Sequence, residues 1–245
     1  MSKHDEEMPS AQDWVEVDTE PNHGEIFKNE QIRAYIAVIR PGEETLYHRH
    51  DRDTLYVVLE GGKNYSTTLP GTKGVKYVLP KSIGLKQKVK WLLTRSIYGW
   101  TYLPKSVCVL MHNEGNPVIH KVRGAEDNPT DMRMLGIEFL NPGGRHGCGS
   151  AGMQSLKVDY EDNTIRVFRL KFPSDLHQMT EALCFMGIVI VLKGDIRIEA
   201  SSPDDSEPVP HDLNEGDLVW NDGGTKFTFA IPVRTEAEAL VVLMK

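Results

Sequence analysis

One stretch of the sequence, residues 42–61, restricts the fold more than any other part of the chain. A Pro-Gly turn ends an apolar run, and two histidines, His48 and His50, follow at a spacing of two. Residues two apart on an extended strand point to the same face, so both imidazoles are expected to enter one cavity. Neutral imidazole is a ligand for Zn, Fe, Ni, Mn and Cu. The stretch therefore predicts a metal-binding pair of histidines, with a second strand over residues 54–59.

The spacing of this stretch resembles the first motif of the cupin superfamily. That motif consists of a glycine, five residues, His-x-His, three or four residues, a glutamate, six residues and a glycine. Four positions match, those of Gly42, His48, His50 and Gly61. The glutamate position holds Thr54, or Leu55 if the gap is four residues. The resemblance implies a jelly-roll barrel with a metal bound by histidines, and Thr54 puts the carboxylate ligand in doubt.

A third histidine is expected from the second motif of the same superfamily, which places a histidine after a Pro/Gly turn. His120 follows Gly115-Asn116-Pro117 and is the candidate. The surroundings depart from the motif, because the turn reads Gly-x-Pro and because Val109 and Gly124 replace the usual glycine and asparagine. His112, at the end of an apolar run, is the competing candidate, and a polar residue at a strand end is its expected role.

The second half of the chain resembles the first without its histidines. If Gly194 corresponds to Gly61, the positions of the His-x-His pair fall on Glu181 and Leu183, and the nearby His177 is isolated. The spacing of the second motif recurs at Gly216, Asp222 and Gly224, but its histidine position holds Phe227. The resemblance therefore implies a bicupin in which only the N-terminal barrel binds metal and the degenerate C-terminal barrel is structural.

The predicted fold class is all-β, with two double-stranded β-helix (jelly-roll) barrels, because many short strands are separated by Gly/Pro turns. Strands are expected over residues 32–40, 63–69, 106–111, 132–140, 164–172, 187–192, 227–231 and 239–244. Residues 1–22 are predicted to be a flexible acidic segment, part of which Trp14 and Val15 could pin to the protein. Residues 23–142 are predicted to be the N-terminal cupin domain, 143–153 a Gly-rich linker and 154–245 the C-terminal domain. The linker interpretation is preferred to a metal or thiol role for His146 and Cys148.

Composition sets the remaining limits. The chain has 245 residues, 40% of them hydrophobic and 26% charged, with a net charge of −7, which favours a soluble globular protein. An apolar run of membrane-spanning length and a secretory signal are both absent from the sequence, so no membrane partner is expected. Cys108, Cys148 and Cys184 are widely spaced and are predicted to be reduced thiols of a cytoplasmic protein.

A long basic interval separates the two motifs, and residues 63–105 are interpreted as an insertion. Between Glu60 and Glu114 the sequence has no acidic residue, but it has nine lysines and arginines and the aromatics Trp91, Trp100 and Tyr102. The alternation over residues 85–91 favours an edge strand, with a short helix as the alternative. The lysines are expected to be solvated and the aromatics to cover a homodimer interface. The competing hypothesis is that the insertion attracts an anionic small-molecule substrate, and nucleic acid is not expected.

Three histidines would leave two or three coordination positions of a metal open, which is typical of a reactive site. Because a threonine hydroxyl is a poor ligand, water is expected in place of the motif glutamate. The resemblance implies one divalent metal, Fe(II) first and Mn, Ni or Zn as alternatives. Among cupins, such shells resemble the three-histidine iron dioxygenases that oxidise thiols or cleave diketones.

Two further residues are candidates for catalysis. Arg52 could pair with a substrate carboxylate, and Tyr56, or alternatively Tyr47, could donate a hydrogen bond. An ion pair with Asp51, Asp53 or Glu60 is the competing interpretation of Arg52. Two other functions remain open: a metal-dependent lyase, decarboxylase or isomerase, and a non-catalytic bicupin that stores or binds a small molecule.

Overall fold

The computed structural model describes residues 14–72, 74–81, 83–141, 156–173, 183–202, 207–231 and 236–245. The chain divides into two compact units, and the boundary between them lies near residue 140. A short segment around Lys81 groups with the second unit, where the Lys81 amide donates to the Asp159 carbonyl at 2.7 Å. The predicted linker, residues 143–153, and with it His146 and Cys148, lies outside the described residues, as do His177 and Glu181.

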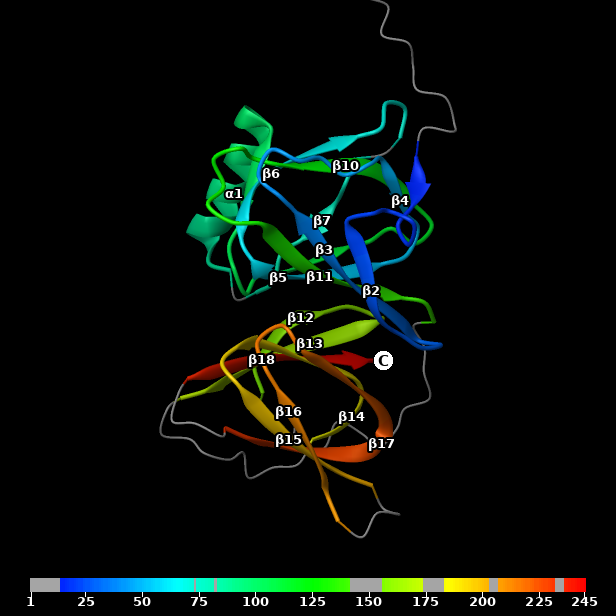
Figure 1. Ribbon diagram of the computed structural model, residues 1–245, viewed down its shortest axis with the longest axis vertical. Coiled ribbons are helices and arrows are strands. Elements are labelled where there is room, and N and C mark those ends of the chain that lie inside the picture. The colour runs from blue at the N-terminus through cyan, green and yellow to red at the C-terminus, as the bar shows by residue number, and fades with distance from the viewer. Residues whose placement is uncertain are drawn as a thin grey trace, which may run out of the picture. The chain divides into compact units, whose positions relative to one another are not determined.

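The first unit consists of two β-sheets and one helix (Figure 1). One sheet has the strand order β1-β4-β10-β6-β8, formed by Val15–Glu16, His48–His50, Val118–Gly124, Gly62–Thr68 and Trp100–Leu103. The other has the order β2-β3-β11-β5-β9-β7, formed by His23–Lys28, Ile32–Ile39, Met132–Phe139, Thr54–Glu60, Cys108–Met111 and Tyr77–Val78. All pairs are antiparallel except the parallel pair of β1 with β4.

The two sheets share one hydrophobic core, because alternate side chains on each strand turn inward. In β10, for example, Val118, His120 and Val122 are buried while Arg123 is exposed. Apolar side chains from both sheets form the core cluster, which includes Tyr35, Ala37, Ile39, Tyr56, Val58, Met111, Val118, Val122, Met132 and Met134.

The backbone geometry explains why two positions of the first motif are glycine. Gly42 has a φ of +77°, a left-handed conformation that side chains rarely adopt. At Gly61, an added Cβ would lie 2.5 Å from the carbonyl oxygen of Leu103, the last residue of β8. The backbone of β8 can therefore come this close only because residue 61 has no side chain. These glycines therefore hold the turns on either side of β4 and β5.

The second unit has a seven-stranded antiparallel sheet in the order β12-β13-β18-β14-β17-β15-β16. The strands are Val158–Glu161, Ile165–Phe172, Ala237–Met244, Leu183–Lys193, Leu218–Ala230, Ile196–Ser201 and Val209–Leu213. Its buried core includes Phe168, Phe172, Phe185, Phe227 and Phe229. The all-β class with two jelly-roll barrels is thus confirmed.

Several details differ from the expectations. Residues 85–91 begin a helix, α1 (Leu85–Tyr98), so the edge-strand interpretation is wrong and the helix alternative is right. The predicted insertion, residues 63–105, also contains most of β6 and all of β8, which are strands of the barrel itself. Trp91 is only 8% exposed and its ring packs edge-on against Tyr77, 5.6 Å between centroids, so it is part of the unit's own interior.

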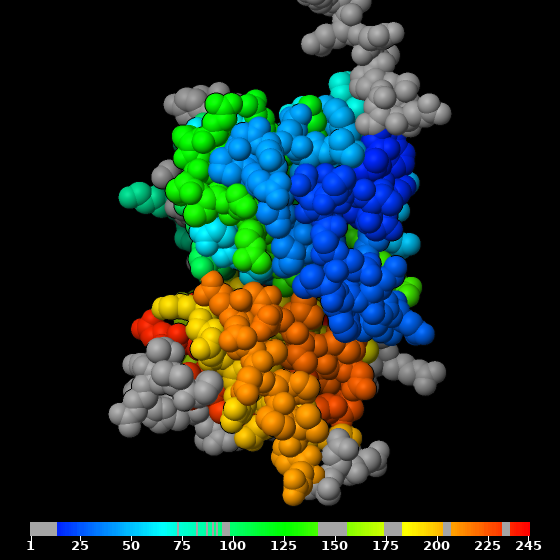
Figure 2. Space-filling model, in the orientation of Figure 1, coloured from blue at the N-terminus to red at the C-terminus, as the bar shows by residue number. Residues whose placement is uncertain are grey.

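Residues 14–22 are not a flexible lead-in. Val15 pairs with His48 in the sheet, and Val17 and Glu20 are buried. In the space-filling view this N-terminal segment, in dark blue, forms part of the surface of the first unit (Figure 2). The N-terminal barrel therefore begins before residue 23.

The expectation of three reduced thiols is wrong for Cys184, which is disulfide-bonded, whereas Cys108 is a buried thiol. Because disulfides are rare in the cytosol, the thiol argument no longer supports a cytoplasmic location, which stays a prediction. Within the described residues, no helix is both long and apolar enough to cross a membrane.

Candidate metal centre

Two neighbouring strands bring the three predicted histidines together. β4 pairs antiparallel with β10, which sets His48 directly opposite His120 and His50 opposite Val118. The alternation of β4 turns His48 and His50 inward and Arg49 outward. The ligand atoms of the three imidazoles lie within 4.8 Å of one another, and all three side chains are buried. The geometry that the His-x-His spacing predicts is therefore present, with His120 as the third member.

Hydrogen bonds fix two of the rings. His48 Nδ1 lies 2.9 Å from the Leu46 carbonyl oxygen, so Nδ1 carries the proton and Nε2 keeps its lone pair. His120 Nδ1 lies 3.0 Å from the Ser66 hydroxyl. Orienting bonds of this kind on the second ring nitrogen are typical of metal-binding histidines.

Burial keeps the imidazoles neutral. It lowers the pKa of His48 to about 4, with the neighbouring His23 adding to the effect. The pKa of His50 falls well below the usual range for the same reason, strengthened by His120 and His48. Only neutral imidazole coordinates a metal, so these two side chains are ready to bind at neutral pH.

The cluster fits a divalent transition metal. Metal–nitrogen bonds of about 2.1 Å place two nitrogens on one ion at most about 4.2 Å apart. The 4.8 Å limit of the cluster is slightly wider, so the rings have to close by a small side-chain movement. Among the described residues, the cluster contains no carboxylate, and three neutral nitrogens suit Fe, Mn, Ni, Zn or Cu.

His48 and His120 of the cluster border a small, mainly apolar cavity. The volume of this cavity is about 40 Å³, which is room for roughly three water molecules. His48, His120, His23, Tyr56 and Asn64 are among its polar walls. The apolar walls are Ile39, Leu103, Val109, Met111, Val122, Met132 and Met134. A ligand that enters must therefore be small.

Two rows of side chains cross the opposite sheet at the level of the histidines. In the first row Gly136 on β11 lies between Tyr35 on β3 and Tyr56 on β5, and the two tyrosine hydroxyls are 2.8 Å apart. A Cβ at Gly136 would lie 2.4 Å from the ring of Tyr35, so the glycine makes room for that ring. Burial raises the pKa of Tyr56 far above its usual range, so its hydroxyl keeps its proton.

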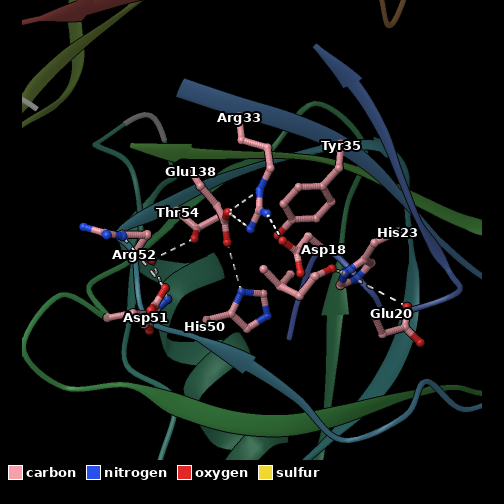
Figure 3. Close-up of polar contacts among 12 residues, drawn as sticks. Asp18, Glu20, His23, Arg33, Tyr35, His50, Asp51, Arg52, Thr54 and Glu138 are labelled. Atoms are coloured by element: carbon pink, nitrogen blue, oxygen red, sulfur yellow. Dashed lines mark hydrogen bonds and ion pairs between the residues drawn. The ribbon is translucent and has the colours of Figure 1, made fainter. Parts of the chain in front are cut away.

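The second row contains buried charges. Glu138 on β11 lies between Arg33 and Thr54, and its carboxylate accepts hydrogen bonds from the Arg33 guanidinium (Figure 3). Arg33 also pairs with Asp18 at 2.9 Å. The second carboxylate oxygen of Glu138 lies 3.8 Å from His50 Nδ1. Burial raises the pKa of Glu138, although Arg33 opposes the shift.

Of the other predicted residues, Tyr56 alone lines the cavity. The Arg52 side chain is 45% exposed, pairs with Asp51 at 3.9 Å as the ion-pair interpretation expected, and does not line the cavity. The Thr54 hydroxyl donates to the Arg52 carbonyl at 3.0 Å and is buried. His112 pairs with Asp53 at 2.8 Å at the end of β9, which matches its expected role. Of the two tyrosines, Tyr56 borders the cavity and Tyr47 does not.

Sequence reasoning missed several residues of the site. His23 lines the cavity, and its ring centroid is 4.8 Å from that of His48. The Glu20 carboxylate lies 3.9 Å from Nε2 of His23. Burial lowers the pKa of His23 to about 4. Glu20 comes from the segment that was predicted to be an acidic lead-in, and His23 follows that segment directly as the first residue of β2. Glu138 did carry a signal, because it is a lone charge among the apolar residues near the end of its strand.

In the second unit, apolar residues fill the equivalent positions. Strand pairing sets Leu183 opposite Phe227, as His48 is opposite His120 in the first unit. In this register Leu183 corresponds to His48 and Phe185 to His50. Both positions lie two residues further along the chain than Glu181 and Leu183, which the sequence comparison had matched to the two histidines. The rings of Phe185 and Phe227 pack edge-on at 5.8 Å, and all three side chains are buried. Phe227 thus occupies the position that corresponds to His120 and fills space there.

The fold and the site together define a class of protein: two jelly-roll barrels in one chain, with a candidate metal centre in the first and an apolar core in the second. No model of a known protein family matches the sequence, and the search of curated proteins finds no relative.

Solved structures do resemble the chain. AerE from Microcystis aeruginosa is similar at a TM-score of 0.51 and 10% identity, over 92% of this chain and 98% of that one. A cupin 2 conserved barrel domain protein from Leptotrichia buccalis is similar at 0.50 and 10%, over 91% and 88%. Bacillus subtilis oxalate decarboxylase, described with Mn(II) centres, is similar at 0.53 and 11%, over 89% and 70%. The chain accordingly shares the two-barrel, bicupin fold of these solved structures.

Proposed function

We propose that this protein is a metal-dependent enzyme that acts on a small molecule in its N-terminal barrel. One divalent transition metal is held by His48, His50 and His120. The observation that carries the proposal is the set of three buried imidazoles within 4.8 Å of one another, two of which, those of His48 and His120, line a cavity. The second barrel has Leu183, Phe185 and Phe227 in the equivalent places, so one metal per chain is expected.

The protein's own side chains prepare the cavity for a reaction. Its apolar walls exclude bulk water, which strengthens every polar interaction inside. Tyr56 holds a proton on its hydroxyl at the cavity wall and is positioned by Tyr35. This hydroxyl donates a hydrogen bond to an oxygen of the bound substrate. The small volume favours substrates of a few heavy atoms.

The reaction we favour is oxidation by dioxygen with Fe(II), of the dioxygenase type. When bound, iron supplies electrons to dioxygen and open positions for the substrate. The three neutral ligands support this choice, because they leave the ion its full positive charge and room for both reactants. Arg52 no longer belongs to this proposal, since its guanidinium lies outside the cavity.

A second candidate is a metal-dependent decarboxylase or other lyase, which needs no oxidant. The cavity of about 40 Å³ suits a small carboxylate. The fold is also that of an oxalate decarboxylase with Mn(II) centres. A metal held by the three histidines would supply Lewis-acid polarisation of a carbonyl or carboxylate, and Tyr56 would have the same donor role.

Reconstitution with single metals separates these functions. The metal-free protein is loaded with Fe(II), Mn(II) or Zn(II) and tested with small thiols, diketones and dicarboxylates, with dioxygen consumption and carbon dioxide release measured together. Oxygen consumption with Fe(II) alone supports the dioxygenase, and carbon dioxide release without oxygen consumption supports the lyase. The control is the His48→Ala/His50→Ala variant, which should bind no metal. Stoichiometric metal in that variant, or none in the wild type, overturns the proposal and leaves a non-catalytic bicupin.

A further inference from the structure

We propose that Glu138 is a positioning residue for the metal ligand His50, and that it supplies from β11 the carboxylate that the first motif lacks at Thr54. The inference rests on the proposed metal site and adds to it a residue that no sequence motif marks. Glu138 does not bind the metal in this proposal. It accepts a hydrogen bond from His50 Nδ1–H, which directs Nε2 of the same ring to the metal.

The strand register is the first argument. Glu138 and Thr54 are directly opposite each other on β11 and β5, so both side chains leave the same face of the sheet. Thr54 is short, and its hydroxyl is used by the Arg52 carbonyl. The longer side chain of Glu138 starts one strand away and reaches the ring of His50 (Figure 3). Glu138 therefore offers a carboxylate at the same level of the sheet as Thr54, one strand away.

The hydrogen bonds of Glu138 are the second argument. Oε2 accepts from Arg33 Nε at 2.8 Å and from a second guanidinium nitrogen. Oε1 is buried and has no hydrogen-bond partner among the residues that the structure describes. It faces His50 Nδ1 at 3.8 Å, about 0.9 Å longer than a normal hydrogen bond. A small rotation of His50, of the size that metal binding already requires, closes this gap.

Only Glu138 distinguishes the two nitrogens of His50. The Tyr56 hydroxyl lies 3.5 Å from Nδ1 and 3.4 Å from Nε2, so it has no preference. It is also bound to the Tyr35 hydroxyl at 2.8 Å. A carboxylate can only accept, so a proton on His50 is held at Nδ1 and the lone pair at Nε2 is left for the metal.

Substitution by glutamine gives a sharp test. In Glu138→Gln, Arg33 retains the amide oxygen, because it is the stronger donor, and the amide NH₂ turns to His50. That donor stabilises the ring form with its proton on Nε2, and this nitrogen then has no lone pair to offer the metal. A loss of such a partner typically weakens metal binding by about 10–100-fold. We expect this range for Glu138→Gln, measured with Co(II) or Zn(II) against a competing chelator dye.

Two variants keep the test decisive. Asp18→Asn removes another carboxylate from Arg33 but does not touch His50, so it should leave metal affinity close to that of the wild type. Arg33→Met/Glu138→Met removes the buried ion pair and replaces it with apolar groups, an exchange that proteins often tolerate. Its affinity should lie between those of the wild type and Glu138→Gln, because no group then favours the wrong ring form.

Each outcome has a definite meaning. Equal affinity of wild type and a folded Glu138→Gln overturns the inference, and so does an equal loss in Asp18→Asn, which would assign the effect to Arg33. A change in the visible spectrum of bound Co(II) that reports a lost ligand shows that Glu138 binds the metal directly, which also overturns it. If the wild type itself binds no metal, the proposed function fails first.

Discussion

Alanine at Gly136 tests how the tyrosine pair is seated beside the histidines. The ideal Cβ of this residue would lie 2.4, 2.6 and 2.7 Å from Cζ, Cε2 and Oη of Tyr35. Normal contacts are at least about 3.4 Å, so the ring has to move by about 1 Å in a close-packed interior. The backbone itself is not in the left-handed region, so the strain comes from the contact alone.

The cost follows from two contributions. Overpacking in a core costs about 1–3 kcal/mol. Displacing Tyr35 also breaks its 2.8 Å hydrogen bond to Tyr56, which is worth about 1 kcal/mol. Gly136→Ala should therefore lower the free energy of unfolding by about 2–4 kcal/mol. Urea denaturation of the metal-free protein measures it, and Gly24→Ala is the matched control, because nothing lies within 4 Å of its Cβ.

A double-mutant cycle with Tyr35→Leu isolates the cause. Leucine lacks the three atoms that the new Cβ would meet, so in this background Gly136→Ala should cost less than about 1 kcal/mol. The two effects are then strongly non-additive. If they add instead, the penalty does not come from the Tyr35 ring, and the reasoning from the contact distances is refuted.

Two further predictions concern pH and the helix. Because burial lowers the pKa of His48 to about 4, its protonation should not weaken metal binding until the pH falls toward 4; loss of metal already near pH 6 in a titration with bound Zn(II) would contradict this. The unfolded chain takes up that proton near pH 6.5, so the metal-free protein should lose stability as pH falls from 6.5 to 4, by about 1.4 kcal/mol per unit from His48 alone. Trp91→Ser should cost about 3–5 kcal/mol in unfolding free energy, since this ring is 8% exposed against Tyr77. Light scattering should show an unchanged molar mass, and a stable variant with a lower mass would place Trp91 at a subunit interface.

Local rules were sufficient for the parts of the site that lie on one strand or one turn. The spacing of His48 and His50 on an extended strand determines that both face inward, and Gly42 and Gly61 mark the turns that bound β4 and β5. His120 could be found because its motif places it after a turn. The alternation of residues 85–91, by contrast, misled the interpretation, because in the structure they form the first turns of the α1 helix.

Register between distant strands decided the rest. Glu138 reaches His50, and Arg33 reaches Glu138, only because β3, β11 and β5 pair in one particular alignment across 105 residues of sequence. The same alignment sets Gly136 between Tyr35 and Tyr56. No spacing rule within a strand contains this information, since a shift of one residue in β11 would turn each of these side chains to the other face. The sequence by itself therefore determined the histidine pair and the barrel that holds it, whereas the tertiary pairing of β3, β11 and β5 decided which buried carboxylate and which tyrosines surround the histidines.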